Sequence, residues 1–127
     1  MRSSTVSVPI MRWLIFLCLV AIGPLAQAGT PSPLEERKIE YLIAAVESLE
    51  GAEFIRNGSA YDGKAAADHL RLKLKNAGSK ITSADDFIRL CASSSSVSGQ
   101  PYQIRFADGH TVTSEAYLRQ RLSEFQG

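Results

Sequence analysis

Few residues in this 127-residue chain have the types and spacing that chemistry requires. The two histidines, His69 and His110, have no cysteine or other histidine within about five residues, so the spacing of a zinc site is missing. The sequence also has no glycine-rich phosphate loop and no Gly-x-Ser-x-Gly nucleophile elbow. We therefore expect no metal, no cofactor and no catalytic residues that the sequence alone identifies.

Binding chemistry has better candidates. Asn57-Gly58 predicts a turn shortly before a helix begins, so the end of the preceding strand and the first turns of that helix must lie close together. On the helix, His69 lies at the border of the apolar face, and Lys73 lies one turn further along the same edge. The convergence predicts either a recognition site or a structural hydrogen-bond network. The candidate binding residues are Arg56, Asn57, Tyr61, His69 and Lys73.

The elements that position these residues are predicted from capping signals and periodicity. A capping box with proline at the first helical position starts a helix at Pro33, and Gly51 is expected to end it. Residues 52–57 predict a strand. Asp62 is expected to cap a second helix that runs through Asn76.

The second half of the chain predicts two more helices and a hairpin. Thr82 is expected to cap a short helix, and Ser114 is expected to cap the last one. Residues 102–106 and 110–113 predict a hairpin that is closed by Asp108-Gly109 as a two-residue type I′ turn. The predicted fold class is α+β in the order α-β-α-α-β-β-α. Its small antiparallel sheet, one strand plus the C-terminal hairpin, is covered by about four helices.

Residues 1–28 predict a cleaved signal peptide. A segment with two arginines precedes an unbroken apolar run from Trp13 to Ile22, which has the length of a signal-peptide core and is too short to span a bilayer. Ala26-Gln27-Ala28 supplies the small residues that a signal peptidase recognises, so we expect cleavage after Ala28. The expectation is the same whether translation starts at Met1 or Met11, and no stable membrane span then remains. The alternative is an uncleaved anchor.

The rest of the chain predicts a short linker, residues 29–33, and a single small domain, residues 34–127. Cys18 leaves with the signal, so Cys91 is then alone and no intramolecular disulfide can form. Cys91 falls on the apolar arc of a short helix, which favours an inert buried thiol over a disulfide-linked homodimer.

Three motifs carry a resemblance to a known family: Phe54-Ile55-Arg56-Asn57-Gly58-Ser59-x-Tyr61, Ala66-x-x-His69-Leu70-Arg71-x-Lys73, and Ser98-Gly99-x-Pro101-Tyr102-x-Ile104-Arg105-Phe106 with the following Asp108-Gly109. Together they resemble the YfeK-like family of small exported proteins of Gram-negative bacteria, over roughly residues 34–125. Tyr117 stands where such proteins have tryptophan, a departure that we expect to alter packing rather than function. The resemblance implies a location in the cell envelope and a common fold. The family has no established activity, so no catalytic residues are implied.

The leading hypothesis is a non-enzymatic periplasmic module that binds an envelope protein or a small polar ligand. The first alternative is a small hydrolase or other enzyme that uses His69 with Tyr61 or Asp62 as acid and base. The second alternative is a purely structural envelope protein. Nucleic acid is not an expected partner, because a net charge of +1 leaves no basic excess.

Cleavage after Ala28 would remove Trp13, the single tryptophan of the chain. Protein recovered from the periplasm should therefore begin at Gly29 and show no tryptophan fluorescence. Intact-mass measurement decides the point. A membrane-bound species that retains residues 1–28 would contradict both the cleavage and the location.

Overall fold

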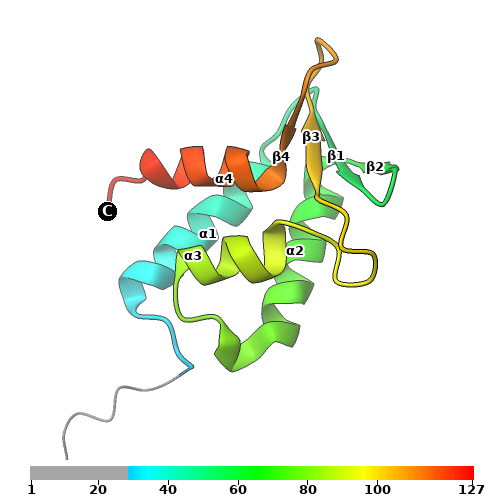
Figure 1. The fold of residues 1–127 in the computed structure, drawn as a ribbon. Helices are drawn as coiled ribbons and strands as arrows, with labels where there is room; N and C mark the ends of the chain where they lie inside the picture. Colours follow the sequence, from blue (N-terminus) through cyan, green and yellow to red (C-terminus); the bar gives the residue numbers. More distant parts are fainter. Residues whose placement is uncertain (1–28) are drawn as a thin grey trace, which may run out of the picture.

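The computed structural model describes residues 29–127, so the predicted signal peptide lies outside the described residues (Figure 1). The fold class is α+β, as predicted, and the four strands gather at one end of the helices (Figure 1). The elements follow one another as α1 (Pro33–Glu47), β1 (Glu53–Arg56), β2 (Ser59–Tyr61), α2 (Gly63–Ala77), the 3-10 turn η1 (Gly78–Lys80), α3 (Ala84–Phe87), its π-helical continuation η2 (Ile88–Ala92), β3 (Gln103–Arg105), β4 (Thr111–Thr113) and α4 (Ser114–Ser123).

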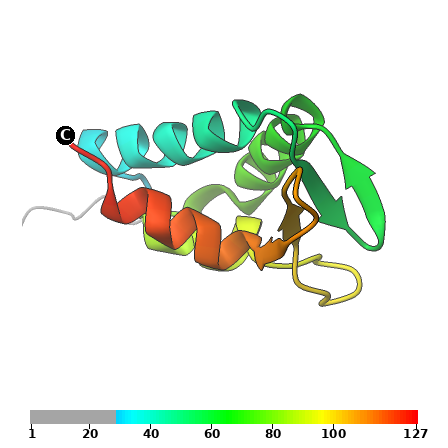
Figure 2. The same cartoon turned by 90° about the horizontal axis from the view of Figure 1, so that it is seen from above.

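The core lies between the helices and one face of the sheet. Seen from above, α1 lies along one edge of the molecule and α4 along the other (Figure 2). The β1–β2 hairpin extends beyond the end of α2 (Figure 2). Apolar side chains at helical spacing on α1 meet those of α2 and α3, because burying these faces together removes apolar surface from water. Within the described residues no helix is long and apolar enough to cross a membrane. The largest fully buried side chains include Leu42, Ile43, Leu70, Phe87 and Ile104.

The sheet has the strand order β2-β1-β3-β4, and all three pairings are antiparallel. It contains a second hairpin that the sequence did not predict, because residues 59–61 form β2 instead of a loop. Asn57 and Gly58 both have positive φ, 50° and 78°, and Arg56 pairs directly with Ser59. This combination is the two-residue type I′ turn that suits the twist of a hairpin.

The type I′ turn that we predicted at Asp108-Gly109 is wrong. Gly109 has a φ of +89°, whereas Asp108 is not among the residues with positive φ. The N–H of Gly109 donates to the carbonyl of Phe106 at 2.9 Å, so the loop has three residues and Gly109 is at its left-handed position. The Asp108 carboxylate accepts the backbone N–H of His110 at 3.0 Å, which stabilises this three-residue loop.

Two predicted helix boundaries also differ from the structure. The C-cap of α1 is Ser48, whose N–H and hydroxyl both donate to the carbonyl of Ala44, so the helix ends before Gly51. The N-cap of α3 is Ser83, not Thr82; Thr82 instead donates to the carboxylate of Asp86. Adjacent serine and threonine side chains have the same capping chemistry, so the sequence pattern does not choose between them.

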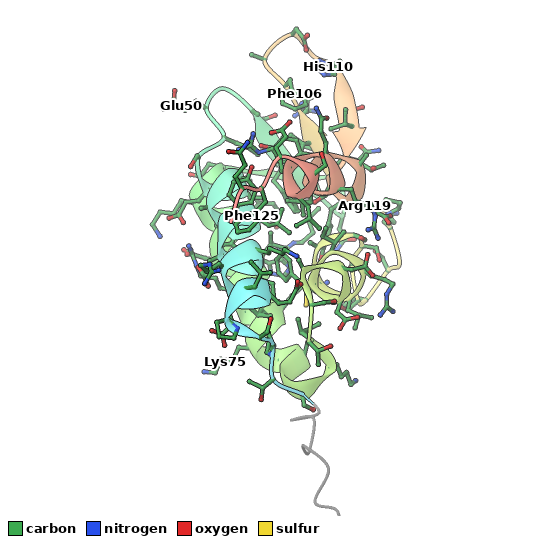
Figure 3. The ribbon with its side chains drawn as sticks, turned by 90° about the vertical axis from the view of Figure 1, so that its left-hand side faces the viewer. Glu50, Lys75, Phe106, His110, Arg119 and Phe125 are labelled. Atoms are coloured by element: carbon green, nitrogen blue, oxygen red, sulfur yellow. The ribbon has the colours of Figure 1, made fainter. Side chains whose placement is uncertain are left out.

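The start of the last helix also differs from the prediction by one residue, here toward the N-terminus. Thr113 is its N-cap and accepts the N–H of Ala116 at 3.1 Å, while Ser114 lies inside the helix and is fully buried. Leu118 enters the core as expected. Phe125 follows the helix and packs edge-on against Tyr41 of α1, with ring centroids 5.3 Å apart (Figure 3).

Cys91 is 1% exposed and belongs to the core, as predicted. Burial raises the pKa of its thiol, although the charge of Lys73 acts in the opposite direction. A thiol that is buried and protonated is a poor nucleophile. The position of Cys91 therefore favours packing over reactivity.

The end of α1 and the start of α2 approach each other at Gly63. A Cβ at this position would lie 2.6 Å from the carbonyl oxygen of Val46 and 2.8 Å from that of Glu47. Both oxygens belong to the backbone, so they cannot move aside as a flexible side chain could. Glycine is required here because of this close approach, not because of its backbone angles.

Gly63→Ala should lower the free energy of unfolding by about 2 to 3 kcal/mol, the usual cost of overpacking, even though alanine favours helix formation. Gly99→Ala is the matched control, because a Cβ there meets no atom within 4 Å and only its positive φ of 71° opposes the change. We expect a loss of about 1 kcal/mol for the control. Urea denaturation compares the two variants, and a Gly63→Ala protein as stable as the wild type would refute the close packing.

Candidate functional site

A cavity of about 330 Å³ lies between the β1–β2 hairpin, α2 and the loop of residues 93–100. The loop runs beside the hairpin (Figures 1 and 2). All five residues that the sequence singled out line this cavity, and their role in binding stays a prediction. The lining consists of Arg56, Asn57, Ser59, Tyr61, His69, Lys73, Ser95, Ser96, Val97 and Tyr102.

Strand register and helix spacing explain the convergence. Phe54 pairs with Tyr61 across the hairpin, and Phe54 is buried, so Tyr61 and Arg56 face the same side of the sheet as a core residue. On α2, His69 and Lys73 are four residues apart and therefore follow one edge of the helix. That edge lies against the hairpin.

Arg56 connects the sheet to α2. Its Nη1 lies 2.6 Å from Nδ1 of His69, and its Nη2 donates to the hydroxyl of Tyr61 at 3.0 Å. The guanidinium also lies over the Tyr61 ring, 4.6 Å from its centroid. The side chain is therefore held in one orientation by three contacts to two residues, neither of which is an acid.

Lys73 also lines the cavity and is held by two hydrogen bonds. Its Nζ donates to the backbone carbonyl of Ser94 at 2.9 Å and to the hydroxyl of Tyr102 at 3.0 Å, and it lies 4.9 Å from the centroid of the Tyr102 ring. Nε2 of His69 lies 3.3 Å from the same hydroxyl. A continuous chain of polar contacts thus runs from Tyr61 through Arg56, His69 and Tyr102 to Lys73.

Asn57 holds the loop of residues 93–100, which forms the rim of the cavity. Its amide donates to Oγ of Ser95 at 3.2 Å and accepts from Oγ of Ser98 at 2.5 Å. Oγ of Ser95 also accepts the backbone N–H groups of Val97 and Ser98. These bonds hold the loop in place while leaving Val97, 96% exposed, at its tip.

The cavity has a positive electrostatic character. Its lining contains no aspartate or glutamate. Neither Arg56 nor Lys73 forms an ion pair with any residue in the part of the chain that the structure describes. Burial lowers the pKa of His69 below its ordinary value of 6.5, and the charges of Arg56 and Lys73 lower this pKa further. His69 is therefore neutral near pH 7.

The sequence did not single out Tyr102 or the serine loop. Tyr102 is 1% exposed and packs on Phe54. The alternating pattern of residues 102–106 predicted a strand and gave no sign that the Tyr102 hydroxyl reaches the cavity. The serine run gave no chemical signal, since serine is common in loops. The one available signal was the motif of the resemblance that runs from Ser98 to Phe106, which includes Ser98 and Tyr102.

Two other polar candidates lie elsewhere. The carboxylate of Asp62 caps α2 by accepting the N–H of Ala65 at 2.7 Å, and Asp62 does not line the cavity. His110 lies on the β3–β4 hairpin, stacked on Phe106 with centroids 4.6 Å apart (Figure 3). Among residues 29–127, no three His, Cys, Asp or Glu side chains gather where they could hold a metal ion.

The lowered pKa of His69 makes a component of stability depend on pH. The unfolded chain takes up the histidine proton near pH 6.5, whereas the folded protein takes it up only at a lower pH, so acidification favours unfolding in the window between the two values. The free energy of unfolding should therefore fall as the pH drops below about 7. The free energy of unfolding of His69→Gln should fall less steeply with decreasing pH. His110→Gln replaces the other histidine and is the control, so its free energy of unfolding should follow that of the wild type. Parallel profiles for wild type and His69→Gln in urea denaturation would contradict this reading.

Comparison with known proteins agrees with the resemblance seen in the motifs. The family model DUF5329, described as a family of unknown function, matches residues 33–126. "Uncharacterized protein YfeK" of Salmonella typhimurium is 43% identical over 68 residues, which are 54% of this chain and 57% of that protein. The matched region thus covers little more than half of that relative's length. No solved structure matches. Because the family model spans nearly all of the described residues, the chain belongs to the DUF5329 family, whose function is unknown.

Proposed function

We propose that this protein is an exported, non-enzymatic binding module of the bacterial envelope. Its ligand is a small polar molecule, or a polar group of a partner protein, held in the cavity beside α2. One observation carries the proposal: five polar residues from β1, the hairpin turn, β2 and α2 converge on one open cavity. Its volume, about 330 Å³, falls in the range of small-molecule sites.

The geometry favours recognition over a purely structural network. A network that serves only stability is closed, with each polar group satisfied inside the protein. Here the residues surround open space, and Arg56 and Lys73 remain without a counter-ion in the described chain. The side chain of Asn57 bonds the rim loop, so the network shapes the cavity.

The geometry gives the hydrolase alternative less support. A general base must accept a proton and is usually stabilised by a nearby carboxylate. His69 instead has the guanidinium of Arg56 at Nδ1 and the ammonium of Lys73 nearby, and both charges oppose its protonation. Asp62 is engaged at the start of α2, away from the cavity lining.

Export to the periplasm is supported by the sequence pattern of residues 1–28, which lie outside the described residues. The apolar run followed by small residues is typical of a cleaved signal peptide. A protein of this size with a rigid polar cavity suits a binding role in the envelope.

The test is a thermal-shift panel of small polar compounds, both charged and neutral, on the wild-type protein. A ligand at about a hundredfold excess over its Kd should stabilise the protein by about 2.7 kcal/mol, which raises Tm by several degrees. Arg56→Ala should lose this shift while its own stability falls by only about 1 kcal/mol, as expected at a partly exposed position.

Arg37→Ala is the matched control, because Arg37 is exposed on α1 and does not line the cavity. It should respond to the same compound as the wild type does. A panel without any stabilising compound, or a shift that Arg56→Ala retains, would refute the proposal. Unfolding of Arg56→Ala at room temperature would support the structural alternative instead.

A further inference from the structure

We propose that the group recognised in the cavity is an oxyanion, a carboxylate, phosphate or sulfate, held by Arg56, Lys73 and the hydroxyl of Tyr102. The inference rests on the proposed function and names the chemical class of its ligand. It follows from the direction of the hydrogen bonds around the cavity, which the donor and acceptor chemistry of each side chain determines.

The direction is set first at Arg56. A guanidinium can only donate hydrogen bonds, so Nδ1 of His69, 2.6 Å from Nη1, must present its lone pair. The proton of the neutral imidazole is then on Nε2. Nε2 lies 3.3 Å from the Tyr102 hydroxyl and therefore donates to it.

The direction is set again at Lys73. An ammonium also only donates, so the Tyr102 hydroxyl accepts from Nζ at 3.0 Å as well. With both lone pairs of its oxygen engaged, Tyr102 still has its own O–H to donate. Among the described residues, no hydrogen bond from this O–H to a protein acceptor is formed.

Tyr102 is 1% exposed, and the two groups that donate to its hydroxyl both line the cavity. Tyr102 itself lines the cavity, so an acceptor bound there would satisfy the remaining O–H. A buried donor without an acceptor costs roughly as much free energy as a lost hydrogen bond, so the site is completed by an acceptor that comes from outside the protein.

Charge points to the same ligand. Five other arginines each form an ion pair with a carboxylate. These arginines are Arg71, Arg89, Arg105, Arg119 and Arg121. Arg56 is held by a histidine and a tyrosine instead, and Lys73 by a carbonyl and a tyrosine. Two cations thus face one cavity whose lining includes no acid, and an oxyanion would neutralise them with charge-assisted hydrogen bonds.

The cavity also indicates what carries the oxyanion. A volume of about 330 Å³ exceeds the space that one such group fills, so the cavity has room for an organic body that carries the oxyanion. The opposite rim offers the hydroxyls of Ser95 and Ser96 and the exposed side chain of Val97. A small organic acid or a phosphate or sulfate ester fits this combination.

Binding should be visible at His69. The groups that face its ring are Arg56 on β1, Tyr61 on β2, Lys73 on α2 and Tyr102 before β3, and none of them is an acid. A bound anion would offset the two positive charges and raise the pKa of His69 toward its ordinary value. A rise in the pKa of His69 on addition of an anion would not be expected if these residues only stabilised the fold.

The experiment is an NMR titration of the imidazole signals, with protein purified from cells that express the full-length chain, in a low-salt cationic buffer. The probes are acetate, succinate, inorganic phosphate and sulfate, with glycerol and glucose as neutral controls. We expect at least one anion to shift the His69 signals saturably and to raise the pKa of His69. The carboxylate and phosphate arms distinguish the two sources of the oxyanion.

Lys73→Gln and Tyr102→Phe should each weaken anion binding by about tenfold or more, because each removes one donor to the anion. Lys75→Gln is the matched control on the same helix. Lys75 is exposed, outside the cavity lining, and lies at the end of the molecule far from the His110 hairpin (Figure 3). It should bind as the wild type does.

The inference is overturned when none of the anions shifts the His69 signals, or when Lys73→Gln and Lys75→Gln weaken binding equally. If neutral compounds alone bind, and Arg56→Ala abolishes that binding, the anion class is wrong while the proposed binding function stands. If neither charged nor neutral compounds bind, both proposals are wrong.

Discussion

The register of β1 against its two neighbours is the constraint on which the cavity depends. A slip of one residue would turn every side chain of the strand to the opposite face. In the observed register Phe54 lies opposite both Tyr61 and Ile104 and enters the core, so Arg56, two residues further on, faces the same side. The burial of one aromatic ring thereby determines where a cation is presented.

Aromatic faces take the place that carboxylates have elsewhere on this protein. Arg56 lies over the ring of Tyr61 and Lys73 over that of Tyr102, at 4.6 and 4.9 Å from the centroids. A carboxylate would hold a cation equally well, but it would also cancel its charge. A π face orients the cation and leaves most of its field available to a ligand. The cavity therefore combines fixed geometry with unneutralised charge.

The sequence predicted those parts of the structure that depend on local chemistry. The starts of α1 and α2 follow from their caps, and the burial of Cys91 follows from helical periodicity. The strand after Asn57-Gly58 was missed because its three residues carry no apolar alternation and are held only by pairing with β1. Tyr102 was missed for a related reason, since its hydroxyl meets Lys73 only after segments 29 residues apart have packed together.

The buried thiol has a consequence for how this fold can form. Residues 29–127 contain Cys91 as their single cysteine, so their fold has no covalent cross-link and rests on its core alone. Within residues 29–127, folding therefore needs neither an oxidant nor a disulfide isomerase, and no mispaired intramolecular bridge can form. The same native structure is therefore accessible in oxidising and in reducing surroundings, and the redox state of a compartment does not decide where the domain can fold.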